Sequence, residues 1–149
     1  MPVEVVCRRA AKKYSAAKIK KIAAAVLELV GEQEAELSLA LVGDHEMQKL
    51  NAKYRDKNYP TDVLSFPADK NLPAPVRWLG DVIISVSKAA AQARERRRTL
   101  DQEMTTLLVH GIVHLLGYDH ERSAKEARVM KRLENKIYRR LCEQRLIKL

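Results

Sequence analysis

The chain has 149 residues, of which 46% are hydrophobic, so it can bury the core of one domain and is not an intrinsically disordered chain. Its 28 Lys and Arg residues against 19 Asp and Glu residues give a net charge of +9, which favours an anionic partner, most commonly nucleic acid. Because no apolar run is long enough to cross a membrane and the N-terminal residues lack a signal-peptide pattern, we expect a cytoplasmic protein with no membrane partner. In that compartment Cys7 and Cys142 are expected to be reduced.

The spacing of apolar residues divides the first sixty residues into strands and helices. Alternation of apolar and polar residues indicates a strand, whereas apolar residues three and four apart indicate a helix. Gly31 ends the first helix, and Gly43-Asp44 offers a cap for the second. These patterns predict a strand at Val3–Cys7, a helix at Ile19–Val30, a strand at Glu36–Val42, a short helix through Met47, Leu50 and Tyr54, and a polar loop from Arg55 to Pro60.

The rest of the chain begins with strands and ends with helices. Three prolines make residues 67–77 an exposed connection between two predicted strands. Hydroxyl side chains mark the starts of the three helices that follow, two of them in capping boxes. The predicted strands are Asp62–Phe66, closed by Pro67, and a central strand at Leu79–Ser85. The predicted helices are an alanine-rich helix capped by Ser87 and ending near Arg97, a helix from the Thr99–Gln102 capping box to about Leu116, and a final helix opened by the Ser123–Glu126 box. The buried stripe of the final helix is Ala127, Met130, Leu133, Ile137 and Leu141.

The order of these elements is β-α-β-α-β-β-α-α-α, with no internal repeat or linker. Such an order is typical of an α+β or mixed α/β protein. We predict an α+β fold with one domain over residues 1–149, in which a mixed four-stranded sheet is covered by about five helices.

The segment from His110 to His120 contains three of the four histidines of the chain. His110 and His114 are four residues apart on a predicted helix, so both rings lie on one face and can reach one ion. Gly117 can end this helix and turn the chain so that His120 reaches the same ion. Three imidazoles without an evident fourth ligand are typical of a catalytic zinc site. One Zn²⁺ per chain is therefore predicted, although imidazole ligands also suit nickel, copper and iron.

The histidines and the glycine match the long zinc-protease signature H-E-x-x-H-x-x-G-x-x-H at every defined position but one. Gly111 stands where the peptidase carries its general-base glutamate. The pattern keeps the metal ligands and lacks the base, which indicates a metal-assisted hydrolase that is not a standard peptidase. A lone histidine on an apolar helix is usually a hydrogen-bonded core residue, but three at this spacing favour a metal site.

Together with three upstream segments, the histidine motif resembles the YbeY endoribonucleases, a bacterial family of metal-dependent proteins linked to ribosomal RNA maturation and ribosome quality control. The resemblance covers roughly the C-terminal two thirds of the chain, and its segments occur in the family's order. These segments are LNAKYR at 50–55, PTDVLSFP at 60–67, LGDVIIS at 79–85 and HGIVHLLGYDHERS at 110–123.

The resemblance implies a zinc-dependent endoribonuclease that prefers single strands and acts in 16S ribosomal RNA 3′-end maturation and ribosome quality control. RNA and the ribosome or its small-subunit proteins would be the partners. His110, His114 and His120 would hold the zinc, with His114 also catalytic, and Arg55 would be a catalytic and RNA-binding residue. The residue chemistry agrees, because zinc lowers the pKa of bound water to about 7 and a guanidinium binds phosphate through two hydrogen bonds.

Several points stay open at this level. The nucleophile is either a water molecule or the 2′-OH of the RNA. Arg55, taken from the sequence alone, is more simply a loop arginine paired with a carboxylate such as Asp56. Asp119 either orients a histidine or shapes a turn, and Tyr118 is expected to pack. Three further polar residues either face the cleft or cap and pair strands, namely Asp62, Ser65 and Asp81.

Two other functions compete with this interpretation. A metallohydrolase of another substrate class, such as a peptidase, would need a base from elsewhere in the fold, and a peptide substrate would not explain the positive charge. An RNA- or ribosome-binding module with a structural zinc would need a fourth protein ligand. The candidates for that ligand are His45, Asp119, Cys7 and Cys142.

Overall fold

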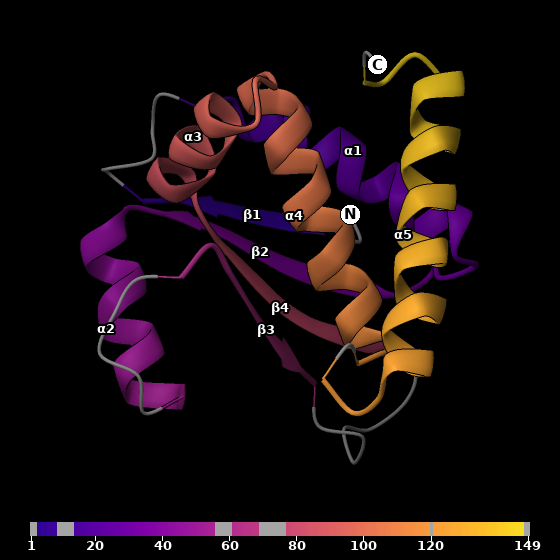
Figure 1. The fold of residues 1–149 in the computed structure, drawn as a ribbon, viewed down its shortest axis with the longest axis horizontal. Helices are drawn as coiled ribbons and strands as arrows, with labels where there is room; N and C mark the ends of the chain where they lie inside the picture. Colours follow the sequence, from indigo (N-terminus) through magenta and orange to yellow (C-terminus); the bar gives the residue numbers. More distant parts are fainter. Residues whose placement is uncertain (1–2, 9–13, 56–60, 69–76, 120, 148–149) are drawn as a thin grey trace.

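The computed structural model describes residues 3–8, 14–55, 61–68, 77–119 and 121–147 (Figure 1). A four-stranded sheet has the order β1-β2-β4-β3, in which β1 pairs with β2 and β2 with β4 in parallel, whereas β3 is antiparallel to β4. This confirms the mixed sheet and the central place of β4. The strands are β1 (Val3–Cys7), β2 (Glu36–Val42), β3 (Val63–Pro67) and β4 (Trp78–Ser85).

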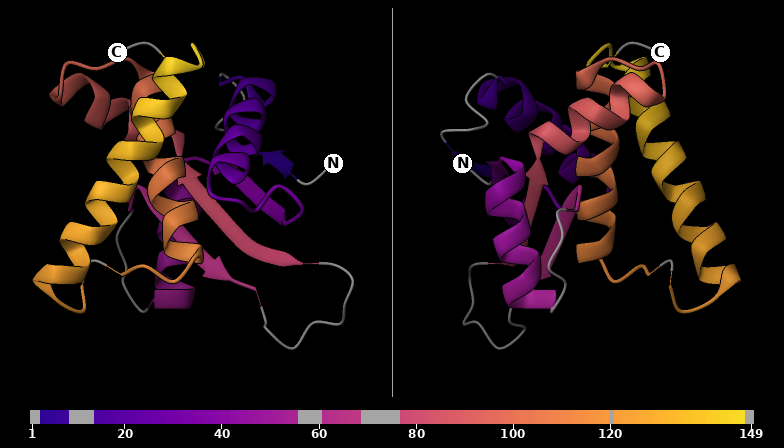
Figure 2. Two further views of the ribbon diagram at one scale, coloured as in Figure 1. Left: turned by 90° about the vertical axis from the view of Figure 1, so that its right-hand side faces the viewer. Right: turned by 60° about the vertical axis from the view of Figure 1, so that its left-hand side comes forward.

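Five helices accompany the sheet in the described residues, as the α+β prediction requires. A large core joins one face of the sheet to α1, α4 and α5, and a smaller core joins the other face to α2. In Figure 2, α4 lies between the strands and α5. None of these helices is both long and apolar enough to span a membrane. The helices are α1 (Ala16–Leu29), α2 (Asp44–Arg55), α3 (Val86–Glu95), α4 (Leu100–Leu115) and α5 (Ala124–Glu143).

The predicted helix starts are correct for α4 and α5 and wrong for α3. Thr99 and Gln102 form the expected reciprocal capping box of α4, and Ser123 Oγ accepts from the Glu126 N–H at the start of α5. The N-cap of α3 is Ser85 rather than Ser87, because Ser85 Oγ accepts from the Lys88 N–H at 3.1 Å. Strand β4 therefore leads into α3 without an intervening loop.

Three other boundaries differ by a few residues. Helix α1 begins at Ala16, because Ser15 caps it by accepting from the Lys18 N–H. Arg55, expected to open a loop, is the last residue of α2, and Pro67 belongs to the edge strand β3, where a missing N–H is tolerated. The predicted loop at 56–60 and most of the proline-rich connection lie outside the described residues.

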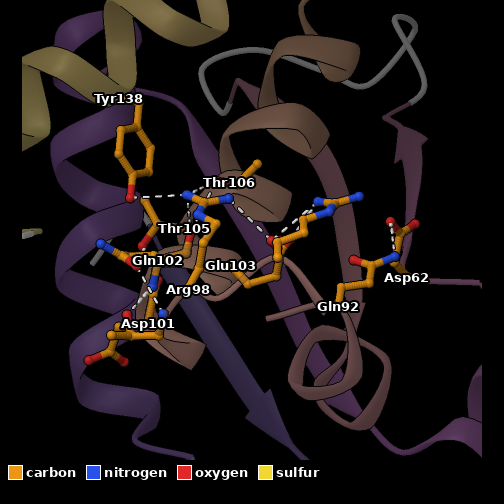
Figure 3. Close-up of polar contacts among 11 residues, drawn as sticks. Asp62, Gln92, Arg98, Asp101, Gln102, Glu103, Thr105, Thr106 and Tyr138 are labelled. Carbon is orange, nitrogen blue, oxygen red and sulfur yellow. Dashed lines mark hydrogen bonds and ion pairs between the residues drawn. The ribbon is translucent and has the colours of Figure 1, made fainter. Parts of the chain in front are cut away.

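A polar network fixes the N-terminal half of α4 (Figure 3). The Glu103 side chain is fully buried and accepts hydrogen bonds from Arg96 at 2.8 Å and from Arg98 at 3.2 Å. Arg98 also donates to Thr106 Oγ1 at 2.9 Å and to Tyr138 Oη at 3.2 Å, so the same guanidinium connects α4 to α5. The network satisfies the buried carboxylate and sets the position of α4 between its neighbours.

Candidate active site

His110 and His114 lie together near the C-terminal end of α4. Their ring centroids are 5.3 Å apart and the ring planes are inclined by 84°. Both side chains are half-buried, whereas the intervening Ile112 and Val113 are buried in the core. The four-residue spacing therefore places two imidazoles at the edge of the core, on one face of the helix, as predicted.

Gly111, between these histidines, packs directly against the sheet. A Cβ atom at this position would lie 2.7 Å from Val82 Cγ1 and 3.2 Å from Ser65 Oγ. Ser65 Oγ also donates a hydrogen bond to the Gly111 carbonyl at 3.1 Å, which identifies Ser65 as a tether between β3 and α4. A side chain at position 111 would require α4 or Val82 to shift, so this packing disfavours the peptidase glutamate that the sequence lacks.

Sequence reasoning did not identify Glu134, which contacts the histidine pair from α5. Its Oε2 atom lies 2.5 Å from His110 Nδ1, and its side chain is only 16% exposed. Because a carboxylate accepts hydrogen bonds, this contact assigns the hydrogen to Nδ1, so Nε2 is the ring nitrogen that could bind a metal ion. The available signal was weak: Glu134 follows Leu133 of the predicted buried stripe, so it lies beside that stripe on the helix.

The turn that follows α4 is held by its own polar groups. Gly117 has a φ of +103°, which favours glycine, and Arg122 donates to its carbonyl at 2.9 Å. Asp119 Oδ1 accepts from the Glu121 N–H at 2.8 Å, and this bond, together with the nearby charges of Arg122 and His114, keeps the pKa of Asp119 below its usual range. Of the two roles left open for Asp119, the turn role has direct contacts.

Tyr118, in the same turn, does not pack as expected. Its relative exposure is 37%, so the ring is available to solvent. The prediction failed because Gly117 turns the chain away from the core immediately before this residue.

Two predicted site residues cannot be placed. His120 lies outside the described residues, and the same holds for the side chain of Arg55, although its backbone ends α2. Over the described part of the chain, no three His, Cys, Asp or Glu side chains gather closely enough to hold a metal ion. Two imidazoles suit zinc, but a catalytic zinc site usually has three protein ligands. His120 remains the predicted third ligand.

Comparison with known proteins identifies the family. The family model described as endoribonuclease YbeY matches residues 4–142. The chain belongs to the YbeY family. An endoribonuclease YbeY from Sulfurihydrogenibium sp. is 43% identical over 141 residues, which cover 94% of this chain and 90% of the relative. Another, from Thermodesulfovibrio yellowstonii, is 42% identical and covers 91% of this chain and 94% of the relative.

A solved structure has the same fold. The solution structure of TM1509 from Thermotoga maritima is similar with a TM-score of 0.67 and 25% sequence identity, covering 96% of this chain and 91% of the other. Membership of the YbeY family confirms the resemblance seen in the motifs and the predicted enzyme class, endoribonuclease.

Among the other residues considered from the sequence, Asp62 has structural contacts. Asp62 accepts from the Val63 N–H at 2.8 Å and from Gln92 Nε2 at 3.2 Å, the latter drawn in Figure 3, so it caps β3 and connects it to α3. Neither Cys7 nor Cys142 forms a disulfide within the described residues, and burial raises the pKa of the Cys142 thiol, which disfavours the thiolate that binds metal. These two and His45 lie on β1, α5 and α2, and they form no ligand cluster within the described ranges.

Proposed function

We propose that this YbeY protein is a zinc-dependent endoribonuclease that prefers single-stranded RNA and acts in 16S ribosomal RNA 3′-end maturation and ribosome quality control. Family membership supports the endoribonuclease chemistry. The metal dependence rests on the pairing of His110 with His114 and on the carboxylate of Glu134 behind His110. The net charge of +9 suits RNA as a partner, and we place the protein in the cytoplasm, with the ribosome or its small-subunit proteins as further partners.

We assign one Zn²⁺ per chain to His110, His114 and His120. When bound, this ion would supply a Lewis acid that polarises a phosphoryl oxygen and lowers the pKa of water. Glu134 holds the His110 ring in one orientation and one tautomer. Arg55 would bind the scissile phosphate through its guanidinium fork and balance the charge that develops on the phosphoryl oxygens.

The packing of Gly111 limits the choice of base. Since position 111 is a glycine packed against the sheet, the proton of the nucleophile has to be taken without the residue that serves peptidases. The nucleophile is then either water or the RNA 2′-OH, and the two routes leave different ends. Water attack that expels the 3′ oxygen leaves a 3′-hydroxyl on one fragment and a 5′-phosphate on the other. Attack by the 2′-OH expels the 5′ oxygen instead and leaves a 2′,3′-cyclic phosphate and a 5′-hydroxyl.

The deciding experiment is cleavage of a 16S precursor fragment that contains the 3′ end, by zinc-loaded protein. His114→Ala and Arg55→Ala should abolish or strongly reduce cleavage, and only His114→Ala should also weaken zinc binding. Matched controls are His45→Ala and Arg94→Ala, which remove an exposed histidine from α2 and an exposed arginine from α3. Cleavage of the same segment after annealing to a complementary strand tests the single-strand preference.

The result separates the competing functions. Cleavage by the parent and the controls but not by the two site variants supports the proposal, and mapping the product ends identifies the nucleophile. Equal cleavage by all five proteins would point to a contaminating nuclease. Zinc binding by the parent without any RNA cleavage would favour a binding module or another hydrolase.

A further inference from the structure

A groove of about 450 Å³ lies between α4 and α5, beside the histidine pair. His110 is one of its lining residues, so the groove adjoins the proposed active site. The lining residues are His110, Ala127, Arg128, Met130, Lys131 and Glu134.

The groove combines an apolar base with a basic rim. Met130 is buried and Ala127 is half-buried, whereas Arg128 and Lys131 are exposed. The two cations are three residues apart on α5, so they project from the same side of the helix about one turn apart. The remaining charged group, Glu134, is turned toward His110 and holds its ring.

Within the part of the chain that the structure describes, neither of these cations stabilises the fold through an ion pair. Arg128 and Lys131 form no ion pair with any described residue, whereas Arg122, close to the motif, is engaged. Arg122 contacts Asp119 at 3.4 Å and the Gly117 carbonyl at 2.9 Å. Two exposed charges that pair with no described residue, beside a proposed catalytic pair, raise the local attraction for a polyanion.

We propose that this groove binds the sugar–phosphate backbone of the RNA strand next to the scissile phosphate, through Arg128 and Lys131. The inference rests on the proposed function, because the position beside His110 identifies the strand as substrate. Ala127 and Met130 offer no side-chain hydrogen bonds to base edges, so the contact depends on phosphate charge and carries no sequence preference. An acidic protein segment is the competing occupant, and the experiment includes it.

The test compares the double variant Arg128→Ala/Lys131→Ala with Lys136→Ala/Arg139→Ala. The second pair removes the same charge from exposed positions of α5 that do not line the groove. Binding of a fluorescein-labelled, unstructured 20-nucleotide RNA is followed by anisotropy over a range of salt concentrations, with a chelator present to prevent cleavage. Cleavage of the same RNA by the zinc-loaded proteins gives KM and kcat.

The groove variant should bind about tenfold more weakly, and the slope of log K against log salt should become shallower by about 1.4, since each single-strand phosphate contact contributes about 0.7. KM should rise while kcat and zinc affinity stay within about twofold. The control pair should change the slope far less.

The outcomes separate this inference from the proposed function. If the parent cleaves RNA and the groove variant keeps the parental KM and salt slope, the groove assignment is wrong and the nuclease proposal stands. If the parent cleaves nothing, yet its RNA affinity and salt slope depend on Arg128 and Lys131, the groove is supported and the nuclease proposal fails. If poly-glutamate binds the parent as tightly as RNA does, and through the same two residues, the groove takes acidic protein and the inference is overturned.

Discussion

At the scale of single residues, Gly111 and Glu134 position the histidine pair through contacts with the sheet and from α5. Gly111 lets α4 approach Val82 and Ser65 closely, and this contact sets the height of the histidines above the sheet. Glu134 reaches His110 from α5 and fixes the orientation of its ring. Neither residue would contact an ion bound by the two histidines, but both would set where the imidazoles point.

Replacing Gly111 with alanine should lower the free energy of unfolding by about 1 kcal/mol. The new Cβ would overlap Val82 Cγ1, and the cost of overpacking, about 1–3 kcal/mol, outweighs the gain of about 1 kcal/mol in helix propensity. Urea unfolding followed by circular dichroism measures the change. In a Val82→Ala background the cost should shrink, because the overlapping methyl is gone. A Gly111→Ala protein more stable than its parent would rule out the close contact.

Replacing Glu134 with alanine should weaken zinc binding by about 10–100-fold, as expected when a metal-binding histidine loses its orienting partner. Glu134→Gln should lose less, since its amide oxygen can still accept from Nδ1–H. The measurement is competition for zinc against a fluorescent chelator, with the exposed Glu143→Ala on the same helix as control. Unchanged affinity in Glu134→Ala would reduce this contact to a tether between helices.

At the scale of elements, α4 is held at both ends. The Glu103 network connects its first turns to the α3–α4 connection and to α5 (Figure 3), and the Gly117 turn directs the chain away after its last residue. Because the histidine pair lies near the C-terminal end of the helix, any rotation of α4 would displace both rings together. The network therefore contributes to the site from a distance.

Glu103→Ala should lower the free energy of unfolding by about 2 kcal/mol. Removing one partner of a buried ion pair leaves the other charge uncompensated, but the effect is moderated here because the Arg96 side chain is 53% exposed and can turn to solvent. Urea unfolding of Glu103→Ala beside Glu95→Ala, an exposed glutamate of α3, provides the comparison. A loss below about 0.5 kcal/mol, the range of ordinary surface substitutions, would show that the network contributes little.

At the scale of the whole molecule, the core is built without the histidines. One continuous apolar cluster joins the sheet to α1, α4 and α5, and Ile112 and Val113 of the motif belong to it. His110 and His114 remain half-buried at its edge. A bound metal would therefore add to a fold that is already complete.

Removing zinc with a chelator should leave the far-ultraviolet circular dichroism of the protein unchanged. Zinc at 100 times its dissociation constant should add about 2.7 kcal/mol to stability through mass action, and the chelator should remove only that increment. His114→Ala should show no zinc-dependent shift in Tm. Unfolding on chelation would instead favour a structural zinc, because such sites supply the folding free energy themselves.

Local signals in the sequence determined most of the fold and part of the site. Strands β1 and β2 follow from alternation, β4 from its apolar run, the α4 start from its Thr99–Gln102 box, and the meeting of His110 with His114 from the geometry of one helical turn. The motif segments were sufficient to identify the family. All of these depend on residues close together in the chain, where spacing alone implies proximity.

The tertiary structure decided what depends on residues far apart in the chain. Glu134 meets His110 across 24 positions, and Ser65 meets Gly111 across 46, because α5 and β3 pack against α4. The exposure of Tyr118 and the choice of Ser85 over Ser87 as a cap depend on where the chain leaves the core or the sheet. No local pattern encodes such contacts, because they are set by the packing of whole elements against one another.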